Sequence, residues 1–208
     1  MQKLIIIGHR GAMAHKPENT LSSFQKAIEL GADVIELDVY LSKDNHAIVI
    51  HDKSVDRTTN GKGNVNELTL EEIKQLTVEE NETIPTLQDV IDLAKGKCKI
   101  NIEVKDEKAL EESIRIVKKN QLEDEVIISS FIQDVIKKSK EINSRIKTAL
   151  LFVTAETKHL ELANNLNAYY LHVHHSMIDK EFLEKAHNLN LKINVWGANN
   201  KKSVKKMV

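Results

Sequence analysis

Two acidic residues and a histidine in one short stretch have the types and the spacing for metal-assisted chemistry. The stretch is expected to form a strand over 34–41, which a polar turn joins to a second apolar run over 47–50. Alternation along the strand places Glu36 and Asp38 on one face, and a hairpin would pair Asp38 roughly with His51. Two carboxylates in an otherwise apolar segment favour a divalent cation held by oxygen ligands, with ordinary surface acids as the alternative.

Further polar residues stand where other apolar runs end. His9 and Arg10 follow the run 4–7, and Glu103 and Lys105 alternate along a later expected strand. Arginine offers a planar fork of donors and lysine offers a point charge, and proteins use both around phosphate groups. Arg10 and Lys105 are therefore candidate phosphate contacts.

The acids and the histidines together indicate a reaction class. Glu36, Asp38 and Glu103 suit Mg²⁺ or Ca²⁺ better than Zn²⁺, because carboxylates dominate the set and no thiol is near them. His9 and His51 titrate near neutrality and can serve as general base and general acid. The combination predicts cleavage of a phosphodiester, with a cation neutralising the charge that develops.

Short apolar runs alternate with helical periodicity along most of the chain. Strand followed by helix at this spacing predicts parallel strands joined by right-handed crossovers. We count seven such units, with an inserted loop and helix region at about 53–85 after the second. A doubly wound sheet would accommodate them, but a barrel fits better, because polar residues collect at the carboxyl ends of strands that are distant in sequence. Strands are expected at 4–7, 34–41, 47–50, 99–104, 126–129, 146–152, 169–173 and 191–196, and helices at 21–30, 70–76, 86–94, 109–120, 132–142, 159–166 and 180–188.

Composition narrows the class of protein. With 208 residues, of which 41% are hydrophobic, the chain is long enough for one large core, so a single domain over 1–208 is expected. A net charge of −1 gives no field for nucleic acid or for an anionic membrane. The single Cys98 cannot form an internal disulfide, and the apolar N-terminal run is too short for a signal peptide or a membrane anchor. These features predict a cytoplasmic protein.

Short motifs occur in a fixed order over nearly the whole length of the chain. Taken together, their order and spacing resemble the glycerophosphodiester phosphodiesterase family. The resemblance implies a (β/α)8 TIM barrel with a small insertion after the second strand. It also implies metal-dependent hydrolysis of glycerophosphodiesters to glycerol 3-phosphate and an alcohol. The motifs are Gly8-His9-Arg10-Gly11, Pro17-Glu18-Asn19-Thr20, Glu36-Leu37-Asp38, His51-Asp52, Asp56-Arg57-Thr58-Thr59, Ile84-Pro85-Thr86-Leu87, Asn101-Ile102-Glu103-Val104-Lys105, Ser129-Ser130-Phe131 and Asn194-Val195-Trp196.

The resemblance also assigns roles to positions of this chain. It implies that two histidines act as acid and base, that three carboxylates bind Mg²⁺ or Ca²⁺, and that two cations contact phosphate. A further carboxylate supports the site, and an aromatic side chain at its mouth packs on the glycerol moiety. In that order, these residues are His9 and His51; Glu36, Asp38 and Glu103; Arg10 and Lys105; Glu18; and Trp196.

Two departures from the family pattern stand near the C-terminus. Members usually carry Val-Trp-Thr-Val-Asn where this chain has Val195-Trp196-Gly197-Ala198-Asn199. They also continue into an eighth strand, which is missing here because the sequence ends at Val208 within the expected last helix. A barrel left open between its first and seventh strands would expose an edge, which favours association into a homo-oligomer.

Alternative functions remain at this stage. A lysophospholipase D-type enzyme would need an apolar rim, and the 4% of aromatic residues gives no sign of one. A catalytically silent binding or structural barrel is the other alternative. Trp196 could be plain core packing, and alternation splits His172, His174 and His175 between two faces, which leaves their role open. Headgroup preference is not encoded in any of these patterns.

Overall fold

The computed structural model describes residues 4–207, and these form two compact units that divide between Ile127 and Ile128. Each unit alternates parallel strands with helices, as the sequence predicted. Among the residues that the structure describes, no helix is both long enough and apolar enough to span a bilayer.

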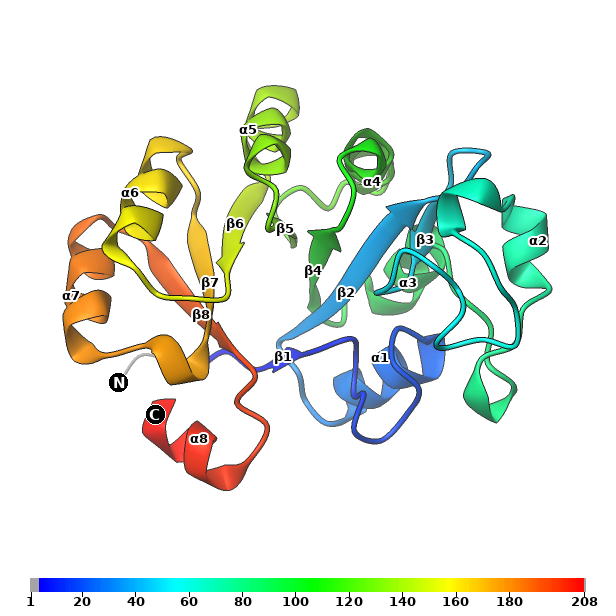
Figure 1. Ribbon diagram of the computed structural model, residues 1–208, viewed down its shortest axis with the longest axis horizontal. Helices are drawn as coiled ribbons and strands as arrows, with labels where there is room; N and C mark the ends of the chain where they lie inside the picture. The colour runs from blue at the N-terminus through cyan, green and yellow to red at the C-terminus, as the bar shows by residue number, and fades with distance from the viewer. Residues whose placement is uncertain (1–3, 208) are drawn as a thin grey trace. The chain divides into compact units, whose positions relative to one another are not determined.

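The first unit is built on three parallel strands (Figure 1). Strand β2 (Val34–Leu41) lies between β1 (Ile7–Gly8) and β4 (Lys99–Val104), and β3 (Ala47–Val49) returns antiparallel along β2. The bounds of β2 and β4 are those that alternation predicted. Both strands are buried almost throughout, because helices cover one face and the other face carries the site described below.

The first strand is shorter than expected. Leu4, Ile5 and Ile6 were predicted to be strand residues, yet they lie before β1 and their exposed fractions are 54%, 52% and 56%. The parallel ladder begins with Ile7 opposite Val34, the first residue of β2. Leu4, Ile5 and Ile6 therefore have no residue of β2 opposite them, and an apolar run alone does not extend a ladder.

Helix caps in this unit follow the side chains that the sequence supplies. The Thr20 hydroxyl accepts a hydrogen bond from the Ser23 N–H at 3.2 Å at the start of α1 (Leu21–Glu29). Thr86 and Asp89 form a reciprocal capping box at the start of α3 (Leu87–Ala94). Helix α4 (Lys108–Lys119) follows β4, and α1 packs against α3.

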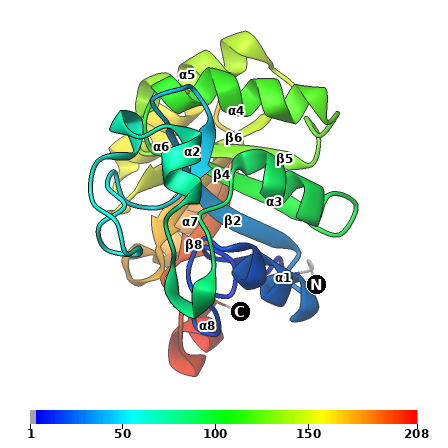
Figure 2. The same cartoon turned by 90° about the vertical axis from the view of Figure 1, so that its right-hand side faces the viewer.

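The segment between β3 and α3 consists of loops and short helices (Figure 2), and it has a small core of its own. It contains the helix α2 (Leu70–Lys74) and two 3₁₀ turns, η1 (Val65–Glu67) and η2 (Glu79–Asn81). Their apolar side chains pack with those of β3, so the segment is a folded extension of the hairpin. The buried members of this cluster are Ile48, Ile50, Val55, Val65, Ile73, Val78 and Ile84.

In the second unit, three strands form a parallel ladder. They are β6 (Lys147–Phe152), β7 (Tyr170–His174) and β8 (Lys192–Trp196), and β5 (Val126–Ser130) spans the division between the units. The helices bury apolar side chains such as Leu160 and Phe182 against this ladder. They are α5 (Gln133–Ile142), α6 (Thr157–Asn165) and α7 (Lys180–Asn188). Helix α8 (Lys201–Met207) contacts the 3₁₀ turn η3 (His175–Met177).

The alternation of parallel strands and helices is that of a TIM-barrel-like α/β fold. The single domain over 1–208, the status of 53–85 as an insertion and the missing eighth strand stay predictions.

Candidate active site

The register of two neighbouring strands brings three acidic side chains together. Asp38 of β2 stands opposite Glu103 of β4, and Glu36 lies two residues earlier on the same face of β2. One oxygen from each carboxylate lies within 4.8 Å of the other two, and the residues are only 6%, 1% and 7% exposed for Glu36, Asp38 and Glu103. The expected convergence of these acids on one point is therefore present.

Three carboxylates in so small a volume repel one another. Burial, and then the charges of Asp38 and Glu103, raise the pKa of Glu36 well above its usual value, and burial also raises the pKa of Glu103. Glu36 Oε1 and Asp38 Oδ1 are buried and accept no hydrogen bond from the described residues. Buried anionic oxygens without donors are costly, so the cluster has the donor chemistry of a site for a divalent cation.

Two fixed cations lie directly against the acids. The Lys105 Nζ is 2.8 Å from Glu103 Oε1 and 3.5 Å from Asp38 Oδ1, and the Arg10 Nε is 3.6 Å from Asp38 Oδ2. Burial alone would lower the pKa of Lys105, but Glu103 and Asp38 raise it above its ordinary value. Lys105 and Arg10 are therefore charged and can contact an anionic substrate beside the carboxylates.

A tight turn after β1 sets the position of Arg10. Its φ of 50° is left-handed, and its backbone N–H donates to Glu36 Oε2 at 2.8 Å. Gly11 follows with φ of 80°, and a Cβ there would lie 2.5 Å from Ser23 Oγ and 2.6 Å from its carbonyl carbon. Only glycine fits that approach, which explains why a glycine follows directly after the arginine.

Asn19 is a site residue that sequence reasoning missed. Thr20 caps the helix that follows, and the buried Asn19 side chain points to the acids. Its Nδ2 donates to Asp38 Oδ2 at 2.9 Å, and its Oδ1 accepts from the Asp38 N–H at 3.4 Å. The Pro17-Glu18-Asn19-Thr20 motif was the available signal, but nothing in it indicated a partner nineteen residues later.

The two histidines flank the cluster from different elements. His9 Nε2 lies 3.9 Å from Glu36 Oε2, and burial and then the charge of Arg10 lower the pKa of His9. His51 follows β3 by two residues, and its Nδ1 lies 2.6 Å from Asp52 Oδ1. His51 is close enough to His9 to contribute to the lowering of that pKa.

The hairpin register differs by one residue from the expected one. The Ile50 N–H donates to the Asp38 carbonyl at 3.0 Å, so Ile50 rather than His51 stands opposite Asp38. The predicted pairing of Asp38 with His51 was wrong because the turn closes with a Ser42 N–H to His46 carbonyl bond at 2.9 Å. That bond centres the hairpin on residue 44 instead of between residues 44 and 45.

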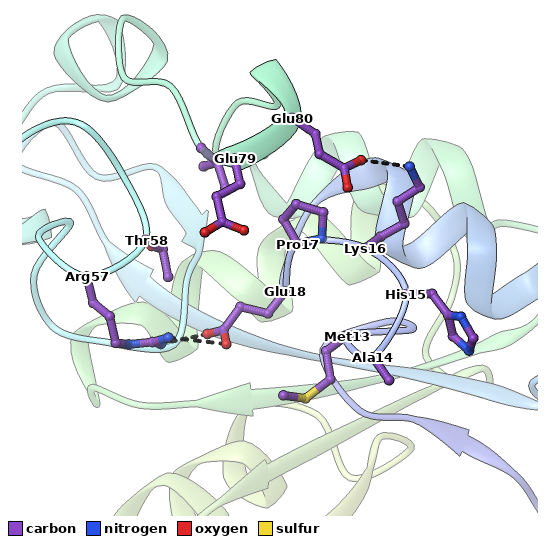
Figure 3. Close-up of a pocket in the computed structure, with 11 residues that line it drawn as sticks. Met13, Ala14, His15, Lys16, Pro17, Glu18, Arg57, Thr58, Glu79 and Glu80 are labelled. Atoms are coloured by element: carbon purple, nitrogen blue, oxygen red, sulfur yellow. Dashed lines mark hydrogen bonds and ion pairs between the residues drawn. The ribbon is translucent and has the colours of Figure 1, made fainter.

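A polar cavity of about 370 Å³ lies beside this cluster in the first unit (Figure 3). Glu18, which accepts a hydrogen bond from Arg10 at 3.0 Å, belongs both to the site and to the wall of the cavity. The wall carries five charged side chains: Lys16, Glu18, Arg57, Glu79 and Glu80.

The remaining candidates lie in the second unit. Trp196 packs edge-on against His174 with ring centroids 4.7 Å apart, and His174 bonds to Ser176 through Nδ1 at 2.7 Å. His172 is buried, pairs with Asn194 at 2.8 Å, and has its pKa lowered to about 4 by burial. Among residues 4–207, the acidic triad is the grouping that could hold a metal, and His172, His174 and His175 do not form another. The contact of Trp196 with glycerol stays a prediction.

A TIM-barrel-like fold with buried carboxylates, imidazoles and fixed cations at its strand ends defines a hydrolase of phosphate esters. Residues 9–208 match the Glycerophosphoryl diester phosphodiesterase family, and the chain belongs to that family. A glycerophosphodiester phosphodiesterase of Caldanaerobacter subterraneus subsp. tengcongensis is 38% identical over 219 residues, covering 99% of this chain and 90% of the relative.

Two solved structures are similar to the whole chain. A phosphodiesterase of Oleispira antarctica, solved in complex with the product sn-glycerol-3-phosphate, gives a TM-score of 0.93 at 27% identity. The match covers 98% of this chain and 88% of that one. A glycerophosphodiester phosphodiesterase of Thermotoga maritima gives a TM-score of 0.84 at 29% identity, covering 100% of this chain and 92% of that one.

Proposed function

We propose that this protein hydrolyses glycerophosphodiesters to glycerol 3-phosphate and an alcohol. Membership of the family supports this reaction, and so does the product named for the Oleispira antarctica relative. The observation that carries the proposal is the buried triad Glu36, Asp38 and Glu103, with Arg10 and Lys105 in contact with it. A phosphodiester is anionic, and its cleavage adds charge that such an arrangement can stabilise.

Each charged side chain has a separate task in this proposal. Arg10 and Lys105 hold the two non-bridging phosphoryl oxygens, and Arg10 orients them through its planar fork. Glu36, Asp38 and Glu103 would hold Mg²⁺ or Ca²⁺, because the donor set is all oxygen. The cation would supply Lewis-acid stabilisation of the phosphoryl oxygens.

The two histidines divide the proton transfers. His9 acts as the general base, because burial and the neighbouring Arg10 lower its pKa and so keep the imidazole neutral near pH 7. His51 acts as the general acid that protonates the leaving alcohol. Asp52 accepts a hydrogen bond from its Nδ1, which leaves Nε2 to deliver that proton.

The nucleophile in this proposal is the substrate's own hydroxyl, next to the esterified glycerol oxygen. His9 takes the proton of that hydroxyl, its oxygen bonds to phosphorus, and the alcohol leaves with a proton from His51. Water then opens the cyclic phosphate with the two roles reversed. A neighbouring hydroxyl exceeds bulk water as a nucleophile because it is held close to phosphorus, and none of the site residues is placed as a covalent nucleophile.

A substrate analogue separates this route from direct attack by water. We expect an analogue with hydrogen in place of the adjacent hydroxyl to be cleaved at least about 10²-fold more slowly, because it lacks the internal nucleophile. The measurement is kcat/KM for the matched pair, with inhibition by the analogue as a control for binding. Equal cleavage of both compounds would favour direct attack by water.

The charged wall of the cavity favours a glycerophosphodiester with a small polar alcohol over a lysophospholipid as the substrate. Lys16, Glu18, Arg57, Glu79 and Glu80 would each lose hydration against an acyl chain, which is unfavourable. This observation weighs against the lysophospholipase D alternative. In that reaction the polar headgroup leaves, and the part of the substrate that keeps the phosphate carries the apolar acyl chain.

A direct assay tests the proposed function. The purified protein is given glycerophosphocholine, glycerophosphoethanolamine or lysophosphatidylcholine, each with Mg²⁺, with Ca²⁺ or with a chelator. We expect metal-dependent release of glycerol 3-phosphate from the first two substrates. Preferential turnover of the lysophospholipid would support the alternative, and no turnover of any substrate would favour a catalytically silent protein.

A further inference from the structure

Arg57 bridges two carboxylates that belong to separate parts of the first unit. Its Nε donates to Asp52 Oδ2 at 2.6 Å and its Nη2 donates to Asp52 Oδ1 at 3.2 Å. The same guanidinium donates from Nη2 to Glu18 Oε1 at 2.6 Å and from Nη1 to Glu18 Oε2 at 3.3 Å. The second pair of bonds is visible in Figure 3. All three nitrogens of the fork are therefore used.

Each of these carboxylates stands behind a different residue of the proposed site. Asp52 bonds to His51 Nδ1 at 2.6 Å, and Glu18 bonds to the Arg10 guanidinium at 3.0 Å. Arg57 is thus the middle residue of a continuous row of hydrogen-bonded side chains that runs from the acid/base His51 to the phosphate contact Arg10. No role in the proposed reaction accounts for it.

We propose that Arg57 is a positioning residue that holds His51 and Arg10 in register through Asp52 and Glu18. We call Asp52, Arg57 and Glu18 together the clamp. The inference rests on the proposed function, because that function gives the clamp its purpose. These hydrogen bonds join the loop after β3 to the turn after β1. Among the described residues, no backbone hydrogen bond links these two segments. Without Arg57, Asp52 and Glu18 would face each other with like charges.

Electrostatics support the role of the clamp in orienting His51. The hydrogen bonds from Arg57, and then that from His51, outweigh partial burial and lower the pKa of Asp52 to about 2. Asp52 is therefore a carboxylate at neutral pH and can only accept, so the proton of this hydrogen bond sits on His51 Nδ1. The Nε2 of His51 is left free for the proton transfer.

Lysine could not replace arginine in this role. Four hydrogen bonds to two carboxylates need a planar fork, whereas a lysine ammonium is a point charge on a flexible stem. The side chain of Arg57 is 49% exposed, so packing does little to hold it. Its position depends on the loop, where the Thr59 N–H bonds to the Val55 carbonyl at 3.1 Å and the Gly63 N–H bonds to Asp56 at 2.9 Å.

Kinetics of three variants test the clamp. We expect Arg57→Gln to lower kcat on the order of 10-fold with KM changed less, because general acid catalysis typically contributes about 10²- to 10⁴-fold and His51 would only be misaligned. Arg57→Lys should recover little of this loss, since the charge is kept but the fork is not. Arg115→Gln is the matched control: Arg115 makes a bidentate pair with Glu112, with both bonds at 2.6 Å, on the exposed face of α4. It should leave kcat and KM unchanged.

A double-mutant cycle shows whether Arg57 acts through His51. We expect Arg57→Gln to lower kcat less than about 2-fold in a His51→Ala background, because its effect on kcat acts through His51, whereas an effect through the phosphate contact Arg10 would appear in KM. Losses that multiply in the double variant would overturn the inference, and so would full activity of Arg57→Lys. The cycle is measured with glycerophosphocholine, whose alcohol needs the proton from His51, and at a high enzyme concentration that keeps the slow turnover of His51→Ala measurable.

A measurement without turnover completes the test. In ¹⁵N NMR of the imidazoles, the His51 signals are assigned by their loss in His51→Ala. At a pH high enough to make His51 neutral, we expect a single Nδ1-protonated tautomer in the wild type and a tautomer mixture in Arg57→Gln. An unchanged tautomer in that variant would refute the clamp even if the wild type hydrolysed no glycerophosphodiester. Failure of the inference is therefore distinguishable from failure of the proposed function.

Discussion

Replacement of His9 or His51 by alanine is expected to lower kcat/KM on the order of 10²-fold or more in each case. Each imidazole is assigned one of the two proton transfers, and none of the carboxylates nearby can replace it. Glu36 is the nearest acid to His9, at 3.9 Å, but its oxygens belong to the proposed cation site. The measurement is the steady-state rate with glycerophosphocholine for both variants.

The pH dependence of kcat/KM distinguishes the two roles. A neutral base and a protonated acid give a bell-shaped profile around neutrality. His9 should set the acidic limb, with activity rising as pH passes through its lowered pKa. His9→Ala should remove that limb. His46→Ala is the control, since His46 is an exposed histidine of the hairpin turn, 3.3 Å from Asp44. Near-wild-type turnover by either site variant would remove that histidine from the mechanism.

Asp38→Asn is expected to have the largest effect on activity, a loss on the order of 10³-fold in kcat/KM. Asp38 stands at the centre of the cluster, where it contacts Asn19, Arg10 and Lys105 and offers an oxygen to the cation site. The amide keeps the size of the side chain but removes its charge. A chelator should lower wild-type activity comparably, and added Mg²⁺ or Ca²⁺ should restore the wild type but not the variant.

Retention of activity by Asp38→Asn at high Mg²⁺ would indicate that the Asp38 carboxylate contributes only to the affinity for the cation. Insensitivity of the wild type to chelation would contradict the assignment of the triad to a cation. Glu71→Gln on the exposed face of α2 is a suitable control, because it removes a carboxylate away from the cluster.

Glu36→Gln should stabilise the cation-free protein while it lowers activity. Burial and the neighbouring acids raise the pKa of Glu36 in the folded state. Such a carboxyl contributes most stability at low pH, and that contribution is lost as pH rises through the folded pKa. In a chelator at pH 7 and above, we expect the Tm of Glu36→Gln to exceed that of the wild type by a few degrees. Divalent cations should raise the Tm of the wild type more than that of the variant. A lower Tm for Glu36→Gln in chelator would contradict the repulsion argument.

Much of the fold could be predicted from local patterns. The bounds of β2 and β4 follow from alternation in apolar runs, and the helix starts at Leu21 and Leu87 follow from the threonines that precede them. Such features depend on neighbours within a few residues, and the sequence states those neighbours directly. The shortened first strand was not predictable in this way, because its length depends on where β2 begins.

The sequence by itself also determined which acids share a face. Glu36 and Asp38 are two residues apart on one strand, and Glu103 lies near the end of the next parallel strand. The parity of a strand then leaves little freedom in where the three carboxylates point. Their convergence within 4.8 Å is a consequence of that parity together with the pairing of β2 with β4.

Only the tertiary structure decided which residues hold the reactive groups in place. Asn19 bonds to Asp38 across nineteen residues, and Arg57 bonds to Glu18 across thirty-nine. The shift of one residue in the hairpin came from how its turn closes. Contacts between loops depend on the backbone path of each loop, and side-chain type and spacing along the sequence do not specify that path. The sequence therefore determined the chemistry of the candidate site, and the folded loops decided its geometry.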